Sequence, residues 1–250
     1  MPVSDRPILI LGGTAEAAKL AAILVTQGHR VISSLAGRTR HPGPIQGEVR
    51  MGGFGGAEGL AAYIGREAVA LLVDATHPFA TRISDNAIAA AAATGIAFVR
   101  LERPAWHAGP GDRWMMVATL DQAAAAIPAG ARVLLALGKQ HIAGFSSRSD
   151  VHFLARMIDP PAAPLGLADF ELELSRPGTP DEEAAFLAAK GITHIVCRNS
   201  GGSASHAKLA AARDLGLPVI MIERPHRPDV TTLADVDGVS AFVTAALKSV

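Results

Sequence analysis

An apolar run near the N-terminus, broken by two glycines, is the feature that most constrains the fold of this chain. Residues 8–11 read ILIL, Gly12 and Gly13 follow, and a helix-compatible stretch runs from residue 17 to residue 25. A strand, a tight turn and a helix in this order let the backbone approach a phosphate, which the free N–H groups of the helix start would bind. The run is not G-x-G-x-x-G, so alone it fits either a dinucleotide site or a plain glycine turn. We assign Gly12, Gly13 and Thr14 to cofactor binding.

The end of the next expected strand, residues 30–35, favours a phosphorylated ribose. Arg38, Thr39 and Arg40 follow this strand, and no acidic side chain lies beside them. In a Rossmann-type fold an acid at this point binds a free ribose 2′-hydroxyl, whereas an arginine suits a 2′-phosphate, which it can hold with two hydrogen bonds. We therefore expect NADP(H) rather than NAD(H), bound by these three residues. A solvated basic loop is the alternative.

A second glycine-rich run lies where the cofactor would continue. Residues 52–56 read GGFGG and follow a short third strand near residues 48–51. Glycines let a backbone come close to a ligand, so we expect Gly53 to contact the cofactor.

The composition excludes several classes of protein. The 250 residues can form two domains of ordinary size, and although 49% are hydrophobic, no apolar run has the length of a membrane span. The single cysteine, Cys197, rules out an internal disulfide and argues against a thiolate metal cluster, so we expect no metal. A net charge of zero and a pI of about 7.1 argue against a general nucleic-acid surface. With no signal-peptide pattern, we expect a cytoplasmic protein with no membrane or nucleic-acid partner.

Strand-like apolar runs alternate with alanine-rich helical stretches along the chain. We expect strands near residues 7–11, 30–35, 48–51, 69–74 and 96–101, and a second series near 114–118, 132–137, 151–156, 171–174, 193–198 and 218–222. This alternation indicates βαβ units with mostly parallel sheets and right-handed crossovers. The fold class is therefore α/β, with two Rossmann-like parallel-sheet domains.

The two halves repeat one another in sequence. Residues 95–104 align without gaps with residues 216–225, and both segments end in Glu-Arg-Pro. The same offset of 121 residues sets 75–78 against 196–199. We infer a duplication from this repeat. Two such domains that face each other would bring the carboxyl ends of both sets of strands to one cleft, and ligands of open α/β sheets bind at those ends. Chance similarity between alanine-rich helices is the alternative.

These patterns divide the chain into four parts. Residues 1–101 form the expected NADP-binding domain and residues 102–113 a connector rich in Pro, Gly and Trp. Residues 114–225 form the second Rossmann-like domain, on the substrate side, and residues 226–250 a C-terminal segment. We expect a helix from about residue 233 to residue 247, but the sequence leaves its docking position open.

The expected fourth strand ends in a polar turn. Pro78 disfavours helical geometry at the residue before it, so Thr76 and His77 lie at the carboxyl edge of the strand. A nicotinamide or its substrate would lie at this edge, so we assign Thr76 to the cofactor. His77, with a reference pKa of about 6.5, is assigned to proton donation or carboxylate binding. A purely structural role is the alternative, and we interpret Asp74 as a hydrogen-bond partner at the strand end.

The corresponding strand end of the second half is also polar. The expected substrate-binding residues are Arg198, Asn199, Ser200, Gly201, Gly202 and Lys208. Donors and free backbone at a helix start suit an anion. Lys139 and His141, in a third strand-end turn, are further catalytic candidates. Lys208 also fits a solvated surface lysine, and Cys197 fits a small hydrophobic residue at the strand end.

These motifs together resemble the precorrin-6A reductase family. The resemblance rests on Gly12-Gly13-Thr14-Ala15-Glu16, Asp74-Ala75-Thr76-His77-Pro78-Phe79-Ala80, Asn199-Ser200-Gly201-Gly202 and the stretch from Lys208 to Val219. They occur in the family's order along almost the whole chain, and the run that begins at Asp74 is the most specific. The resemblance implies a two-domain reductase of cobalamin biosynthesis that uses NADPH to reduce a double bond of precorrin-6A, giving precorrin-6B. Its substrate would be a polycarboxylate tetrapyrrole, and other enzymes of the pathway are conceivable partners.

Several other functions stay open at this point. Some reductases of the family act on cobalt-containing analogues of the same intermediate, which the sequence does not exclude. A non-catalytic NADP-binding sensor would keep the glycine turns without needing the polar strand end of the second half. A short-chain or nucleotide-sugar reductase would be expected to carry Tyr-x-x-x-Lys, but Tyr63 is followed four residues later by Glu67.

Overall fold

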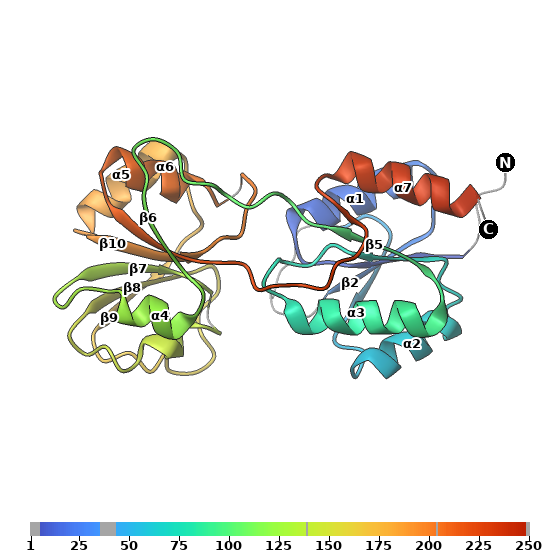
Figure 1. Ribbon diagram of the computed structural model, residues 1–250, viewed down its shortest axis with the longest axis horizontal. Coiled ribbons are helices and arrows are strands. Elements are labelled where there is room, and N and C mark those ends of the chain that lie inside the picture. Colours follow the sequence, from blue (N-terminus) through green and yellow to red (C-terminus); the bar gives the residue numbers. More distant parts are fainter. Residues whose placement is uncertain (1–5, 36–43, 139, 204, 249–250) are drawn as a thin grey trace. The chain divides into compact units, whose positions relative to one another are not determined.

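Two six-stranded parallel sheets, one in each of two domains, form the structure, and the strands at their centres are buried and apolar (Figure 1). The computed structural model describes residues 6–35, 44–138, 140–203 and 205–248. Domain 1 comprises Met1–Pro104 together with His226–Val250, and domain 2 comprises Ala105–Pro225. The C-terminal segment, whose position the sequence left open, therefore belongs to domain 1.

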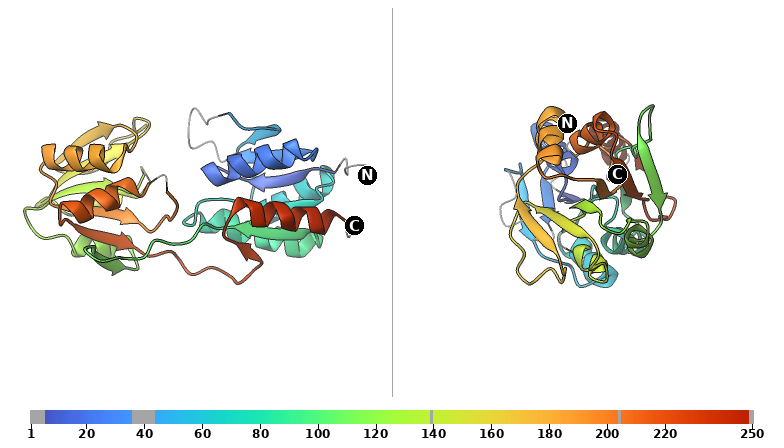
Figure 2. Two further views of the ribbon diagram at one scale, coloured as in Figure 1. Left: turned by 90° about the horizontal axis from the view of Figure 1, so that it is seen from above. Right: turned by 90° about the vertical axis from the view of Figure 1, so that its left-hand side faces the viewer.

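Domain 1 is a doubly covered sheet with the strand order β12-β5-β4-β1-β2-β3. Its strands are β1 (Ile8–Leu11), β2 (Val31–Leu35), β3 (Glu48–Met51), β4 (Leu71–Asp74), β5 (Ala97–Leu101) and β12 (Thr232–Leu233), and its helices are α1 (Ala15–Thr26), α2 (Ala57–Arg66), α3 (Thr81–Thr94) and α7 (Val236–Lys248). Helices α1 and α7 lie side by side on one face of this sheet, and α2 and α3 cover the other (Figures 1 and 2). Every residue of β1 and β4 is buried, as expected for parallel strands covered on both faces.

Strand β1 shows how the sequence builds the two layers of domain 1. Successive side chains of a strand point to opposite faces, so Ile8 and Ile10 pack with α1 and α7. Leu9 and Leu11 pack on the opposite face with α2 and α3. The uninterrupted apolar run thus forms the centre of two cores at once.

Domain 2 has the strand order β6-β11-β10-β7-β8-β9. Its strands are β6 (Arg113–Val117), β7 (Arg132–Ala136), β8 (His152–Met157), β9 (Phe170–Leu174), β10 (His194–Arg198) and β11 (Pro218–Ile222), and its helices are α4 (Leu120–Ala125), the short 3-10 helix η1 (Ile142–Phe145), α5 (Pro180–Ala189) and α6 (Ala207–Asp214). Helices α5 and α6 cover one face and α4 the other (Figure 1).

Each sheet takes its outermost strand from the segment that leaves the other domain. After β5 and its Glu-Arg-Pro the chain enters domain 2 and forms β6, which pairs with β11. After β11 and its Glu-Arg-Pro the chain returns to domain 1 and forms β12, which pairs with β5. Domain 1 is therefore completed only by the C-terminal segment of the chain.

The strand registers show where the repeat holds and where it shifts. The expected offset sets Arg100 of β5 against Met221 of β11. Asp74 pairs with Arg100 in one sheet, and Cys197 pairs with Met221 in the other, so Asp74 corresponds to Cys197. The expected alignment of residues 75–78 with 196–199 is thus wrong by two residues, because the connection from β10 to β11 is two residues shorter than that from β4 to β5. Thr76 then corresponds to Asn199.

The architecture confirms the α/β fold with two Rossmann-like domains. Each of the eleven strands expected from the sequence is present within two residues of its expected bounds. The sequence did not predict the two-residue strand β12. The expected cleft between the domains stays a prediction. Within the described parts of the chain, every helix is too short or too polar to cross a membrane.

Candidate functional site

The glycine turn after β1 has the geometry that a phosphate group requires. Gly13 has a φ of +108°, which residues with a side chain rarely adopt, and a Cβ added there would meet no described atom within 4 Å. The Thr14 hydroxyl caps α1 by accepting a hydrogen bond from Ala17 N at 3.1 Å. Ala15 and Glu16, the first two residues of this 12-residue helix, have no carbonyl of an earlier helical residue to which their N–H groups could donate. The turn could therefore hold an anionic group, and binding of the cofactor by Gly12, Gly13 and Thr14 stays a prediction.

A single hydrogen bond connects this turn to the polar turn after β4. Thr14 Oγ1 donates to Ala75 O at 2.9 Å, so the same hydroxyl caps α1 and holds the exit of β4. The neighbouring backbones also pair, since Ala75 N donates to Leu11 O at 2.9 Å. The structure thus brings together Thr14 and Thr76, two of the residues assigned to the cofactor.

Asp74 fixes the polar turn from below. Its carboxylate is fully buried and accepts hydrogen bonds from Thr76 N at 3.1 Å, Thr76 Oγ1 at 2.6 Å and Ser84 Oγ at 2.5 Å. Arg100 of β5 places its Nε 3.7 Å from the same carboxylate. A buried charge needs such partners, because desolvation alone would strongly disfavour it. Asp74 is therefore a hydrogen-bond partner at the strand end, as the sequence indicated, and not an exposed acid.

The segment that returns from domain 2 completes this buried network. Arg227 donates to Ser84 Oγ and forms an ion pair with Glu102 at 2.7 Å. Arg100 Nη1 donates to Pro228 O at 3.3 Å. Sequence reasoning missed Arg227, because its partners lie more than a hundred residues away along the chain.

A small recess lies at the strand ends of domain 1, where these elements meet. It is lined by Thr14, Glu16, Thr76, Pro78, Leu101, Glu102 and Arg103. Arg103 of the first Glu-Arg-Pro forms an ion pair with Glu16 at 2.9 Å, at the first turn of α1. The recess thus combines the glycine turn, the polar turn and the repeated motif.

His77 has a defined ring orientation at the exit of β4. Its Nδ1 accepts a hydrogen bond from Phe79 N at 3.2 Å, and its carbonyl accepts one from Ala80 N at 2.8 Å. A ring nitrogen that accepts a hydrogen bond carries no proton, so the neutral ring has its proton on Nε2. The ring could take up a second proton, on Nδ1, only after the hydrogen bond from Phe79 N to Nδ1 is lost.

The adenosine end of the expected cofactor site is described in part. Arg38, Thr39 and Arg40 lie outside the described residues. Gly53 is described, and its carbonyl accepts a hydrogen bond from Arg50 Nη2 at 3.1 Å.

Two candidate side chains meet at the strand ends of domain 2. Arg198, the last residue of β10, places Nη1 3.2 Å from His141 Nε2, in the turn after β7. Gly138 has a φ of +76° in the same turn, and Lys139 lies outside the described residues. The structure therefore brings together a catalytic candidate and a substrate-binding candidate from different strands.

The loop after β10 is held by Trp106, which sequence reasoning missed. Asn199 exchanges two hydrogen bonds with the Trp106 backbone, at 2.8 and 2.9 Å, and is therefore occupied. The indole N–H of Trp106 donates to Gly202 O at 2.8 Å, and Gly201 and Gly202 both have positive φ. Arg224 donates to the carbonyls of Asn199 and Ser200 at 3.0 and 3.2 Å. The repeated Glu-Arg-Pro was the available signal for Arg224.

Lys208 is buried inside this loop, so the alternative of a solvated surface lysine is wrong. Its side chain donates to Ser205 O at 2.5 Å and lies 5.0 Å from the centre of the Trp106 ring. Burial lowers the pKa of the Lys208 amine and raises the pKa of the buried Cys197 thiol. Cys197 thus packs as a small hydrophobic residue, as expected, and contact of Lys208 with a substrate stays a prediction.

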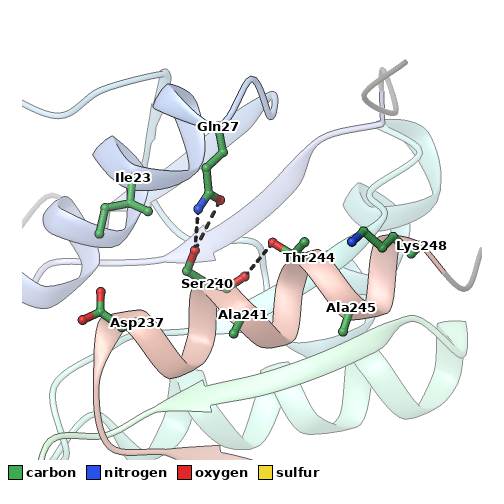
Figure 3. Close-up of a pocket in the computed structure, with 8 residues that line it drawn as sticks. All are labelled: Ile23, Gln27, Asp237, Ser240, Ala241, Thr244, Ala245 and Lys248. Atoms are coloured by element: carbon green, nitrogen blue, oxygen red, sulfur yellow. Dashed lines mark hydrogen bonds between the residues drawn. The ribbon is translucent and has the colours of Figure 1, made fainter. Parts of the chain in front are cut away.

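A groove of about 560 Å³ lies elsewhere on domain 1, between α1 and α7 (Figure 3). It is lined by Ile23, Gln27, Asp237, Ser240, Ala241, Thr244, Ala245 and Lys248. Gln27 and Ser240 hydrogen-bond across it at 2.9 Å, which fastens the C-terminal helix to the domain. The groove lies on the helix layer and not at the strand ends, so we do not assign the reaction to it.

Comparison with known proteins places the chain in a family. Residues 7–244 match the family model "Precorrin-6x reductase CbiJ/CobK". The chain belongs to the precorrin-6x reductase family. It is 47% identical to the precorrin-6A reductase of Rhodobacter capsulatus over 94% of this chain and 95% of that protein, and 34% identical to the cobalt-precorrin-6A reductase of Priestia megaterium over 87% and 90%. The solved structure "CobK precorrin-6A reductase" superposes with a TM-score of 0.92 and 46% identity, covering 96% of this chain and 97% of that one.

Membership of the precorrin-6x reductase family agrees with the reductase expected from the sequence. Among the described residues, no group of three or more His, Cys, Asp or Glu side chains could hold a metal ion. The strand-end turns supply hydrogen-bond donors, cations and backbone N–H groups.

Proposed function

We propose that this chain reduces a ring double bond of precorrin-6A with NADPH and gives precorrin-6B. The observation that carries the proposal is the joining of the capped glycine turn to the Thr76–His77 turn through Thr14, in a chain of the precorrin-6x reductase family. An anion site and a polar strand end lie side by side there, as a nicotinamide cofactor requires.

Residues of domain 1 would hold the cofactor. The backbone of Gly12 and Gly13 and the start of α1 would bind the pyrophosphate, and Thr76 would lie toward the nicotinamide. Arg38, Thr39 and Arg40 are proposed to bind the ribose 2′-phosphate. NADPH, when bound, supplies the hydride, so the protein contributes orientation and electrostatics.

The remaining candidates would serve the substrate. Neutral His77 would donate a hydrogen bond from Nε2 to the macrocycle. It would deliver a proton only from the imidazolium form, which requires release of the Phe79 N–H bond to Nδ1. Arg198 and His141 would bind carboxylates, since a guanidinium pairs with a carboxylate through two hydrogen bonds. Ser200, Gly201 and Gly202 would add backbone donors, and Lys139 and Lys208 stay candidates for the same task.

The metal-free substrate is favoured over its cobalt-containing analogue. The identity to the Rhodobacter capsulatus precorrin-6A reductase exceeds that to the Priestia megaterium cobalt-precorrin-6A reductase. The Arg198–His141 pair at the strand ends of domain 2 argues against a sensor that only binds NADP, because such a protein would not need it.

An anaerobic turnover assay tests the proposal. The purified chain is mixed with NADPH and either precorrin-6A, cobalt-precorrin-6A or no tetrapyrrole, and NADPH oxidation and product mass are followed. We expect oxidation with precorrin-6A, and a product heavier by one hydride and one proton. NADPH binding without reduction of either tetrapyrrole would overturn the reductase and favour the sensor.

A further inference from the structure

Arg50, near the end of β3, hydrogen-bonds to a hydroxyl and to backbone carbonyls, whereas the nearby arginines Arg30 and Arg66 pair with carboxylates. Its Nη1 donates to Ser34 Oγ at 3.0 Å and to Gly52 O at 2.9 Å, and its Nη2 donates to Gly53 O at 3.1 Å. Its guanidinium carbon lies 3.8 Å from the centre of the Phe54 ring. The side chain is therefore held in one place before any ligand binds.

The positive charge of Arg50 is not neutralised within the described part of domain 1. No described carboxylate lies within ion-pair distance of it, whereas Arg30 pairs with Glu48 at 2.7 Å and Arg66 pairs with Glu67 at 3.2 Å. A guanidinium has five N–H donors, and three of those of Arg50 have described partners. Two donors and a full charge remain for an anion.

The position of Arg50 in the sheet indicates which anion it would bind. Arg50 pairs in register with Ser34, one residue before the end of β2. In a Rossmann-type domain the end of this strand meets the adenosine ribose of the dinucleotide. An arginine that is held at that point and has no carboxylate partner among the described residues suits a negatively charged phosphate on the ribose better than an uncharged hydroxyl.

The same strand positions in domain 2 are occupied differently. Following the registers outward from β10, the Ser34 position corresponds to Arg156 of β8. Arg156 pairs with the buried carboxylate of Glu183 at 2.7 Å. The Arg50 position itself corresponds to Glu173 of β9. Domain 2 thus has a carboxylate at this edge and a paired arginine one strand further in, whereas domain 1 has Arg50 at the edge without a carboxylate among the described residues.

We infer that Arg50 is a specificity-determining residue that binds the ribose 2′-phosphate of NADP(H). The inference rests on the proposed function and concerns a residue of β3 that the sequence analysis did not assign to the phosphate. Its hydrogen bonds to Gly52 and Gly53 also hold the glycine-rich run, so loss of Arg50 must be tested separately for loop damage and for phosphate recognition.

Binding of two nucleotides that differ only in the 2′-phosphate distinguishes loop damage from loss of phosphate recognition. Adenosine 2′,5′-bisphosphate and 5′-AMP differ only in the 2′-phosphate, and calorimetry gives both dissociation constants for wild type, Arg50→Gln and Arg50→Lys. We expect Arg50→Gln to weaken binding of the bisphosphate by about ten- to a hundredfold and to leave 5′-AMP nearly unchanged, because one charged contact is lost. Arg50→Lys should lie between, since it keeps the charge without the planar fork.

Arg66→Gln is the matched control, because Arg66 lies 5.0 Å from the Tyr63 ring of the same aromatic cluster but is paired with Glu67. It should keep the wild-type preference. Equal weakening of both nucleotides by Arg50→Gln would reduce Arg50 to a loop-holding residue and overturn the inference. If Arg50→Gln keeps the wild-type preference for the bisphosphate over 5′-AMP, the role of Arg50 is overturned and the proposed function is unaffected. A wild type without any preference for the bisphosphate would overturn the NADPH assignment as well.

Discussion

The two domains share one strand order but fill corresponding positions with opposite chemistry. In domain 1, the ends of β4 and β5 carry the buried pair of Asp74 and Arg100. At the corresponding positions of domain 2, Cys197 Sγ lies 3.6 Å from Met221 Sδ. The same strand arrangement thus accommodates either the Asp74–Arg100 pair or the Cys197–Met221 pair, so the fold itself does not require an ion pair at this position. What Asp74 adds is the fixed Thr76 turn above it.

The corresponding strands β1 and β7 are also followed by different structure. In domain 1, β1 leads through a capped turn into a 12-residue helix. In domain 2, β7 leads into a 3-10 helix of four residues. The partial charge at a helix start comes from aligned peptide dipoles, which a single short turn hardly accumulates. We therefore propose that the phosphates of the cofactor bind to domain 1 and that side-chain cations bind ligand in domain 2.

The largest effect should come from the histidines at the two strand ends. We expect His77→Ala to lower kcat by about 10²–10⁴-fold if the ring delivers a proton, with NADPH affinity nearly unchanged. His141→Ala, in domain 2, should mainly raise KM for the tetrapyrrole, because its proposed role is carboxylate binding. Steady-state kinetics of both variants tests this division. A His77→Ala enzyme with wild-type kcat and KM would remove His77 from the site.

The next effect concerns the buried pair of domain 1. Asp74→Cys alone leaves Arg100 buried and unpaired, which should cost about 3–5 kcal/mol in the free energy of unfolding. The double variant Asp74→Cys with Arg100→Met installs the sulfur pair of domain 2 and should recover much of this loss, because no uncompensated charge remains. Urea unfolding of the two single variants and the double variant measures the coupling.

Activity of the same double variant separates folding from function. With Asp74 gone, Thr76 loses two hydrogen bonds, so we expect low turnover even where stability returns. A stable double variant with wild-type turnover would show that the fixed turn is not needed for the reaction.

A smaller effect should distinguish the two glycine turns. Gly13→Ala and Gly138→Ala both force a side chain into a positive φ, +108° and +76°, and each should cost about 1–3 kcal/mol in stability. Only Gly13→Ala should also raise the dissociation constant for NADPH, because its new methyl group would occupy the space open to a phosphate. Fluorescence titration with NADPH checks this. Equal effects of the two variants on NADPH binding would contradict the assignment of the phosphates to domain 1.

Sequence reasoning located the strands and the polar turns because these depend on local patterns. Apolar runs, glycines and Pro78 mark where a strand stops, and Asp74 lies close enough to Thr76 for their contact to be expected. The β12 strand was missed because two residues carry no recognisable pattern. The sequence left open which sheet takes each strand beside the Glu-Arg-Pro motifs, because a local pattern does not say which sheet a strand joins.

The parts of the site that sequence reasoning missed depend on distant residues. Arg227 contacts Ser84, 143 residues away along the chain, and Trp106 contacts Asn199, 93 residues away. The burial of Lys208 follows from how Trp106 covers it, which composition cannot show. The two-residue shift of the repeat became visible only through the pairing of β10 with β11.

The smallest predicted effect concerns how each crossing segment is fastened to the domain that it enters. The segment that enters domain 1 is tied by Arg227 to Glu102. The segment that enters domain 2 is tied by Asp112, which accepts two hydrogen bonds from Arg213, at 3.0 and 2.8 Å, and one from Gly109 N. The Arg213 guanidinium holds the pKa of the Asp112 carboxyl below its usual value.

A carboxyl whose pKa is depressed by folding contributes stability above its unfolded pKa, and this contribution is lost as pH falls through the folded value. We therefore expect Asp112→Asn to lower stability by about 1 kcal/mol at neutral pH, since Arg213 is partly exposed. The difference from wild type should shrink below about pH 4, where the wild-type carboxyl also becomes protonated. Urea unfolding at a series of pH values measures it. A difference that stays constant down to acidic pH would mean that Asp112 fastens the segment through packing and hydrogen bonds to its neutral form, and not through its charge.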